Sequence, residues 1–140
     1  MKKMLFLISI AAFSLSAFAQ THAALGNGTI GEYKKFDLLA ARIGDVVGGS
    51  VQFHAATNTG IIAINAKVQK AIFEKNAVHT AGEGMLNDKH VFVEVLAVDG
   101  TPEHKPDFFS IRVFNKEGNV VFEASGAVIH GNIIVKHSKT

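Results

Sequence analysis

Apolar residues stand at every second position through most of the chain beyond residue 28, between short runs rich in Gly, Asn and Asp. Alternation of this kind predicts β-strands, because successive side chains of a strand point to opposite faces. The clearest example is segment 107–114, where Phe109, Ile111 and Val113 share one face and the other carries a serine and an arginine. We therefore expect a strand with one buried face and one solvated face.

Segment 91–98 is apolar at every position except Glu94. A strand without a polar face is expected where protein covers both of its faces, so this segment is predicted to be a central strand. The predicted core residues are Val93, Val95, Phe109 and Ile111.

Turn-forming residues separate these strands from others. Segment 115–118 (Asn-Lys-Glu-Gly) fits a type I turn followed by a left-handed glycine, and Asn87-Asp88 is expected to close an earlier hairpin. Further strands are predicted at 33–42, 50–55, 61–68, 71–75, 78–86, 89–98, 120–122 and 128–136. Segment 63–76 also has the Ala and Lys content of a helix, but its Ile, Val and Phe residues favour strands.

Short strands at close spacing, without a convincing helix, predict an all-β fold: an antiparallel β-sandwich or a partly open barrel. A domain of about 120 residues has room for one hydrophobic core and not for two. We expect a single all-β domain over 28–137, with a flexible segment before it at 20–27 and a tail at 138–140.

The N-terminus has the three parts of a secretory signal peptide. Lys2 and Lys3 precede an apolar run over 4–13, and small residues at Ala17 and Ala19 fit a cleavage site after residue 19. The run is shorter than the roughly 20 apolar residues of a membrane-spanning helix. The sequence thus predicts residues 1–19 as a signal peptide, a periplasmic or secreted mature protein, and no integral membrane insertion after cleavage.

Charge and cysteine content narrow the classes of partner. Loss of Lys2 and Lys3 with the leader leaves equal numbers of basic and acidic residues, with no cluster of Lys and Arg. Nucleic acid and anionic membranes call for such clusters, so neither is an expected partner. The chain has no cysteine, which excludes disulfides and thiolate metal sites.

Metal binding has two sets of candidates. None of the seven histidines falls at a ligand spacing such as H-x-x-x-H or H-x-H, although His54, His79 and His90 could converge in space. The loop 99–107 supplies acidic candidates for calcium. These are Asp99, Glu103 and Asp107. Their spacing does not fit an EF-hand, and the favoured interpretation is a polar connecting loop in which Asp99 bonds nearby backbone amides.

Catalytic motifs are missing from the sequence, and we predict no catalytic residue and no cofactor. Serines occur at positions 50, 110 and 125 without a G-x-S-x-G elbow. Glu74, Glu83 and Glu94 fall in predicted strands, where an outward, solvated carboxylate is the default. A small enzyme remains the alternative, and it would need a converging trio such as His79, Glu94 and His90.

A succession of motifs runs through the C-terminal two-thirds of the mature chain. The motifs are Ala71-Ile72-Phe73, Ala81-Gly82-Glu83-Gly84, Leu86-Asn87, the alternating run from Val91 to Asp99-Gly100, Asp107-x-Phe109-x-Ile111-x-Val113, Val120-Val121-Phe122 and Gly131-x-Ile133. In this succession the chain resembles the bacterial post-COAP domain family. The loop after Asp99 lacks the family's run of glycines, and the domain follows its own signal peptide rather than a larger protein. The resemblance implies an exported, β-rich domain of no established activity.

These observations predict an exported, non-enzymatic β-domain that is a binding or structural module of the bacterial cell envelope or secreted fraction. The expected partner is a protein, a glycan or a second copy of the chain. The alternatives are a small periplasmic or secreted enzyme and a calcium-stabilised structural domain.

Overall fold

The computed structural model describes residues 20–139, so the predicted signal peptide lies outside the described residues. Nine strands make up most of this part of the chain. They are β1 (Gln20–Ile30), β2 (Lys34–Ile43), β3 (Val46–Thr57), β4 (Gly60–Lys67), β5 (Lys70–Phe73), β6 (Ala77–Leu86), β7 (Lys89–Val98), β8 (Phe108–Phe114) and β9 (Val120–Lys139). A single 3-10 turn, η1 (Thr101–Glu103), precedes β8. Between residues 20 and 139 no helix is long and apolar enough to cross a membrane.

The strands form a closed antiparallel barrel, which confirms the all-β prediction. Neighbours in sequence pair with each other except β4 and β5, β1 pairs with β9, and β4 pairs with β6. Eight strands thereby complete the circle, and β5 is an additional strand on the edge of β6. The barrel is closed, whereas the sequence predicted a sandwich or a partly open barrel. It closes because β1 pairs with β9 and β4 pairs with β6, so no long strand edge is left unpaired.

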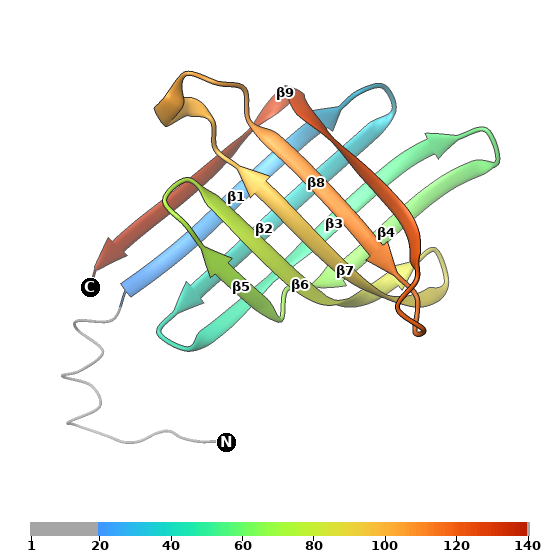
Figure 1. The fold of residues 1–140 in the computed structure, drawn as a ribbon, viewed down its shortest axis with the longest axis horizontal. Helices are drawn as coiled ribbons and strands as arrows, with labels where there is room; N and C mark the ends of the chain where they lie inside the picture. The colour runs from blue at the N-terminus through green and yellow to red at the C-terminus, as the bar shows by residue number, and fades with distance from the viewer. Residues whose placement is uncertain (1–19, 140) are drawn as a thin grey trace.

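The barrel is flattened into two layers (Figure 1). Strands β5 to β8 lie toward the viewer and cross the strands β1 to β4 behind them. The long strand β9 belongs to both layers, since its first part pairs with β8 and its second part pairs with β1. We call the outer surface of β5 to β8 the front face, and the outer surface of β1 to β4 with the second part of β9 the back face.

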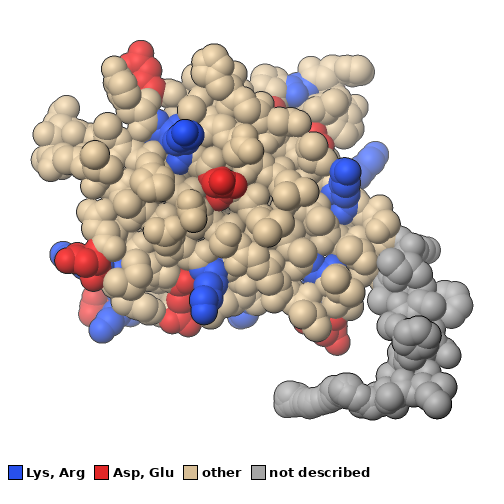
Figure 2. Space-filling model, turned by 180° about the vertical axis from the view of Figure 1, so that it is seen from behind, with Lys and Arg blue, Asp and Glu red and all other residues tan. Residues whose placement is uncertain are grey.

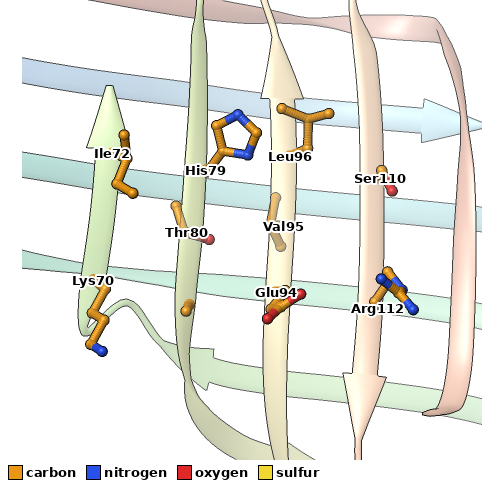
Figure 3. A pocket seen from close by; sticks show the side chains of 10 residues that line it. Lys70, Ile72, His79, Thr80, Glu94, Val95, Leu96, Ser110 and Arg112 are labelled. Carbon is orange, nitrogen blue, oxygen red and sulfur yellow. The ribbon is translucent and has the colours of Figure 1, made fainter. Parts of the chain in front are cut away.

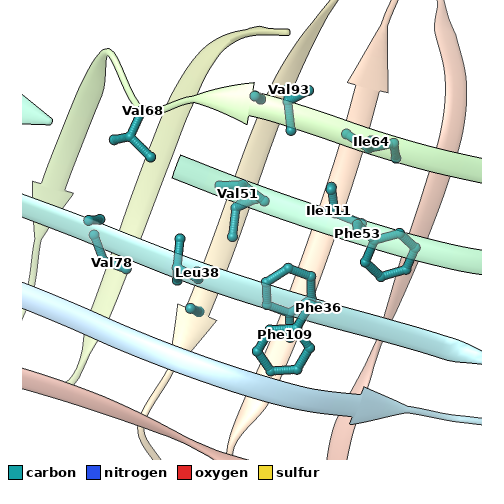
Figure 4. Close-up of a cluster of buried hydrophobic side chains, with 14 of the residues drawn as sticks. Phe36, Leu38, Val51, Phe53, Ile64, Val68, Val78, Val93, Phe109 and Ile111 are labelled. Atoms are coloured by element: carbon teal, nitrogen blue, oxygen red, sulfur yellow. The ribbon is translucent and has the colours of Figure 1, made fainter. Parts of the chain in front are cut away.

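Inward-facing side chains fill the space between the layers (Figure 4). Phe36 of β2 stacks on Phe109 of β8 at 4.1 Å between ring centroids, and Phe53 of β3 lies 6.1 Å from the same ring. The four predicted core residues, Val93, Val95, Phe109 and Ile111, are all buried. The core is therefore shared between the two layers.

Strand β7 differs from its prediction. Its inward residues are buried, but Phe92 is 40% exposed and Glu94 also faces solvent. The expectation that protein covers both faces of this strand is wrong, because a barrel wall is one layer thick and its outer surface meets solvent. The apolar outer positions belong to the front face.

The ends of the described chain also differ from their prediction. Residues 20–27 were expected to be flexible, yet they form most of β1 and pair on both sides, with β2 and β9. Strand β9 runs unbroken from residue 120 to residue 139, where the sequence predicts two shorter strands and a tail. At Gly131 (φ 107°) a side chain would collide with the carbonyl of Asn27, so glycine lets the two strands approach closely there.

The predicted turns are confirmed. The side-chain oxygen of Asn115 accepts backbone N–H bonds from Glu117 and Asn119, and Gly118 has φ of 86°. Asn87, at φ 54°, closes the hairpin between β6 and β7. Asn adopts this left-handed conformation more readily than most residues, which explains why these two turns could be recognised.

Candidate functional site

The candidate sites for a ligand lie on the outer surface of the barrel. An eight-strand barrel either fills its interior with side chains or holds one small ligand there. Here the interior contains the buried Phe, Ile, Leu and Val side chains of the core. Two surface hollows, one on each face, present polar groups instead.

The back face carries a hollow of about 540 Å³, which we call the polar hollow. Its polar lining residues come from β1, β2, β3 and β9. They are Asn27, Thr29, Lys35, Asp37, Gln52, His54 and His130. Gly28 and Gly131 line it as well, and their lack of side chains keeps the wall thin at this point.

Strand register arranges these polar residues in two rows across the back face. The first row consists of Asn132, Asn27, Asp37, Gln52 and Asn65, which are consecutive partners on β9, β1, β2, β3 and β4. The second row consists of His130, Thr29, Lys35 and His54. Neighbouring strands lie about 4.8 Å apart, so each row is a regular ladder of hydrogen-bonding groups.

The polar side chains of the hollow contribute no hydrogen bonds or ion pairs to the described fold. Within residues 20–139, the side chains of Asn27, Asp37 and Gln52 form no hydrogen bond or ion pair with protein groups, and the same holds for those of Lys35, His54 and His130. The Thr29 hydroxyl is buried and has no hydrogen-bond partner in the described part of the chain. Buried polar atoms usually have one, so this hydroxyl is unusual.

Figure 2 shows the back face in space-filling form. Most of its surface is uncharged, with Lys, Arg, Asp and Glu gathered toward the margins and an acidic side chain near the middle. Beside the first polar row, Leu25 pairs in register with Leu39 and with Ile134, and these three side chains are 38–48% exposed. A polar ladder and an aliphatic row thus lie next to each other.

The front face carries a second hollow of about 320 Å³, the charged hollow (Figure 3). Lys70, Glu94 and Arg112 occupy one cross-strand row, and Ile72, His79, Leu96 and Ser110 occupy the next. Two of its groups, His79 and Arg112, already have partners. His79 Nε2 lies 3.3 Å from a carboxylate oxygen of Glu74, and the Arg112 guanidinium lies 5.3 Å from the ring centroid of Phe114.

The predicted catalytic trio does not assemble. His79 and Glu94 both line the charged hollow, but His90 lies near the start of β7, opposite Met85. Its Nε2 atom is 2.9 Å from a carboxylate oxygen of Glu83. Glu74 was expected in a strand and instead follows the end of β5.

Two serines are also placed by the structure. Ser110 lines the charged hollow, and Ser125 is its cross-strand partner inside β9 rather than part of a turn. Neither hydroxyl has an imidazole partner among the hydrogen bonds of the described residues.

Two aspartates of the acidic loop 99–107 accept hydrogen bonds from backbone amides of the loop itself and of β9. Asp107 accepts two backbone N–H bonds, from Gly100 at 2.8 Å and from Ile133 at 2.7 Å. Asp99 accepts from Thr101 at 3.0 Å, which confirms its predicted turn bond, and from Val135 at 3.4 Å.

Both carboxylates therefore accept hydrogen bonds from backbone amides of β9 that lie beyond the start of β8. Glu103 lies exposed in η1 and does not join them. In residues 20–139, no group of three or more His, Asp or Glu side chains could hold a metal ion, and His54, His79 and His90 lie on different parts of the wall.

A histidine pair stands at the other end of β9. His22 of β1 and His137 of β9 are cross-strand partners whose Nδ1 atoms lie 2.7 Å apart. The pKa of His22 is lowered from its ordinary value by burial, then by electrostatic interaction with His137 and Arg42. Sequence reasoning missed this pair because it treated both chain ends as loose.

The polar hollow was also missed. Asp37 stands between two core residues, Phe36 and Leu38, and this alternation marks it as outward-facing. Its neighbours in the row come from strands far apart in sequence, so only the register brings them together. The chain matches no family model, no curated protein and no solved structure.

Proposed function

We propose that this protein is an exported, non-enzymatic module of the bacterial envelope or secreted fraction that binds a glycan on the polar hollow of its back face. The observation that carries the proposal is the double row of polar side chains that have no partner within the described chain. Export rests on the signal-peptide pattern of residues 1–19, and the resemblance to the post-COAP domain supports the same class of protein.

The chemistry of the hollow suits a ligand rich in hydroxyl groups. Asn27 and Gln52 each offer a donor and an acceptor, the ionised Asp37 accepts, and Lys35 donates. A sugar hydroxyl donates one hydrogen bond and accepts others, so neighbouring hydroxyls can be bonded by such a mixed set. Asp37 is the central member of the first row, where it can accept from two hydroxyls at once.

The aliphatic row completes the match to a carbohydrate. A sugar ring has C–H surfaces as well as hydroxyl edges, and Leu25, Leu39 and Ile134 form an exposed apolar surface beside the polar row. Tyr33, which is 76% exposed, lies in the turn between the two strands that carry Thr29 and Lys35. An aromatic ring in that position can pack against a ring face at the edge of the hollow.

A protein partner fits the hollow less well. The centres of protein–protein interfaces are depleted in charged residues and enriched in large aromatic anchors. The polar hollow has the opposite composition, with Asp37, Lys35 and two histidines among its lining residues. The back face therefore favours the glycan over the protein and self-association alternatives.

The experiment is a glycan array followed by titration calorimetry with the best-bound oligosaccharide. We expect Asp37→Ala and Gln52→Ala each to weaken binding by roughly tenfold, the effect of losing one or two hydrogen bonds. Glu94→Ala is the matched control, since it removes an exposed strand carboxylate from the front face. Absence of any bound glycan, or equal weakening by Glu94→Ala, would overturn the proposal.

A further inference from the structure

The ends of β1 and β9 bring two imidazoles together in a defined arrangement. His22 and His137 face each other across the strand pair, with 2.7 Å between their Nδ1 atoms and 4.9 Å between their ring centroids. Phe73, from β5, stacks on the His22 ring at 5.3 Å with an interplanar angle of 22°. Three strands therefore determine the position of the pair.

The hydrogen bonds of the pair fix which ring nitrogen of His137 carries the proton. Its Nε2 atom lies 3.0 Å from the backbone carbonyl oxygen of Lys75, which can only accept. Nε2 therefore carries the proton, and the Nδ1 lone pair of His137 points at His22. A backbone carbonyl on the far nitrogen is the support that metal-binding histidines usually have, because it fixes the tautomer and the ring orientation.

The two Nδ1 atoms form a hydrogen bond, and their separation is also close to that of adjacent ligands at about 90° around one ion. With metal–nitrogen bonds of about 2.0 Å, adjacent ligands of a square-planar ion lie about 2.8 Å apart, while ligands of a tetrahedral ion lie about 3.3 Å apart. The observed 2.7 Å is close to the first value. Square-planar nitrogen sites favour Cu²⁺ or Ni²⁺ over Zn²⁺, and Cu²⁺ binds most tightly of the three.

We propose that His22 and His137 bind one Cu²⁺ ion as adjacent equatorial ligands through their Nδ1 atoms. When the metal binds, the His22 proton leaves Nδ1 and His22 takes up a proton at Nε2 by exchange with solvent, so each imidazole coordinates as a neutral ligand. A surface hollow of about 420 Å³ adjoins the pair and is lined by Gln20, Lys75 and Ser138. It leaves room for water molecules in the remaining coordination positions.

A competing mode of copper binding must be separated from this one. If the leader is cleaved after Ala19, the mature chain begins Gln20-Thr21-His22. A free amino terminus with histidine in third place can chelate Cu²⁺ through the amine, the two following amide nitrogens and the imidazole. That mode does not use His137, and it requires the first residues of β1 to leave their extended, paired conformation.

The test is calorimetric titration of the mature protein with Cu²⁺, with electron paramagnetic resonance to identify the bound nitrogens. We expect one ion per chain, with binding weakened roughly tenfold or more in His22→Gln and in His137→Gln. Adding one alanine before Gln20 should leave binding unchanged, because the cross-strand pair is intact. His104→Gln, in the exposed loop, is the matched control and should also bind normally.

Other outcomes would overturn the proposal. Binding that survives His137→Gln and disappears in the alanine-extended chain would assign the copper to the amino-terminal chelate. Binding that survives both His22→Gln and His137→Gln would assign it to other residues. Thermal melts of each variant show whether it is folded, and Phe73→Leu, which removes only the stacking ring, should weaken binding less than either histidine substitution.

Discussion

The front and back faces of the barrel are made from the same kind of strand, yet they treat their polar groups differently. On the front face, His79 bonds Glu74, His90 bonds Glu83, and Arg112 packs over Phe114, while Lys70, Glu94 and Ser110 form no side-chain hydrogen bond or ion pair within residues 20–139. On the back face, the polar rows around Asp37 have no partner within the described residues.

This difference indicates which face has polar groups available to a ligand. Groups that bond each other contribute to the barrel itself, and a ligand must break those bonds in order to use them. Groups without partners lose only water when a ligand binds, so they are more readily available. The comparison therefore favours the back face for the proposed ligand, and each prediction below changes one of the two faces or the core that they share.

The largest expected effect comes from the core that both faces share. Phe109→Ala should lower the free energy of unfolding by about 3–5 kcal/mol, because it empties a fully buried position beneath Phe36 and Phe53. Phe92→Ala, on the outer surface of the neighbouring strand, should cost much less. Chemical denaturation measures both. Equal effects of the two substitutions would mean that the inner and outer faces have been assigned incorrectly.

The next effect concerns the loop that fastens β9. Asp107→Asn replaces one of two carboxylate oxygens that accept backbone N–H bonds, and we expect a loss of about 1–3 kcal/mol. Glu103→Gln, in the same loop but exposed, should change little. Melting curves in calcium and in chelator should coincide for the parent protein. A rise with calcium that Asp107→Asn abolishes would instead support the calcium-stabilised domain.

A smaller effect is expected on the front face. His90→Gln removes an exposed contact with Glu83, and such surface pairs contribute about 0.2–1 kcal/mol. Denaturation at low and at high salt should show a small loss that salt reduces. A loss of several kcal/mol would show that the front-face pairs are central to stability, contrary to our comparison.

The smallest effect on stability is predicted for the back face. Asp37→Asn keeps the shape of the side chain and breaks no protein bond, so the free energy of unfolding should stay within about 0.5 kcal/mol of the parent. Its effect on glycan binding should be clear by comparison. If Asp37→Asn proved strongly destabilising, the carboxylate would have a structural partner and the case for a free binding group would fail.

The sequence alone determined the local structure of this protein. Alternation placed Phe109, Ile111 and Val113 on the inner face, and Asn87 and the Asn115 turn marked hairpins, because strand periodicity and turn preferences depend on residues close together in the chain. The outward position of Asp37 could also have been recognised in this way. The turn bond of Asp99 was predicted for the same reason, since its acceptor and donor are two residues apart.

Only the tertiary structure decided how the strands close and which residues meet. The pairing of β1 with β9 joins segments more than a hundred residues apart, and it turned the expected loose ends at residues 20–27 and 138–139 into paired strands. The same pairing brings His22 to His137, while register across β9, β1, β2 and β3 builds the polar rows. Register depends on side-chain packing over the whole sheet, so no single segment of the sequence contains it.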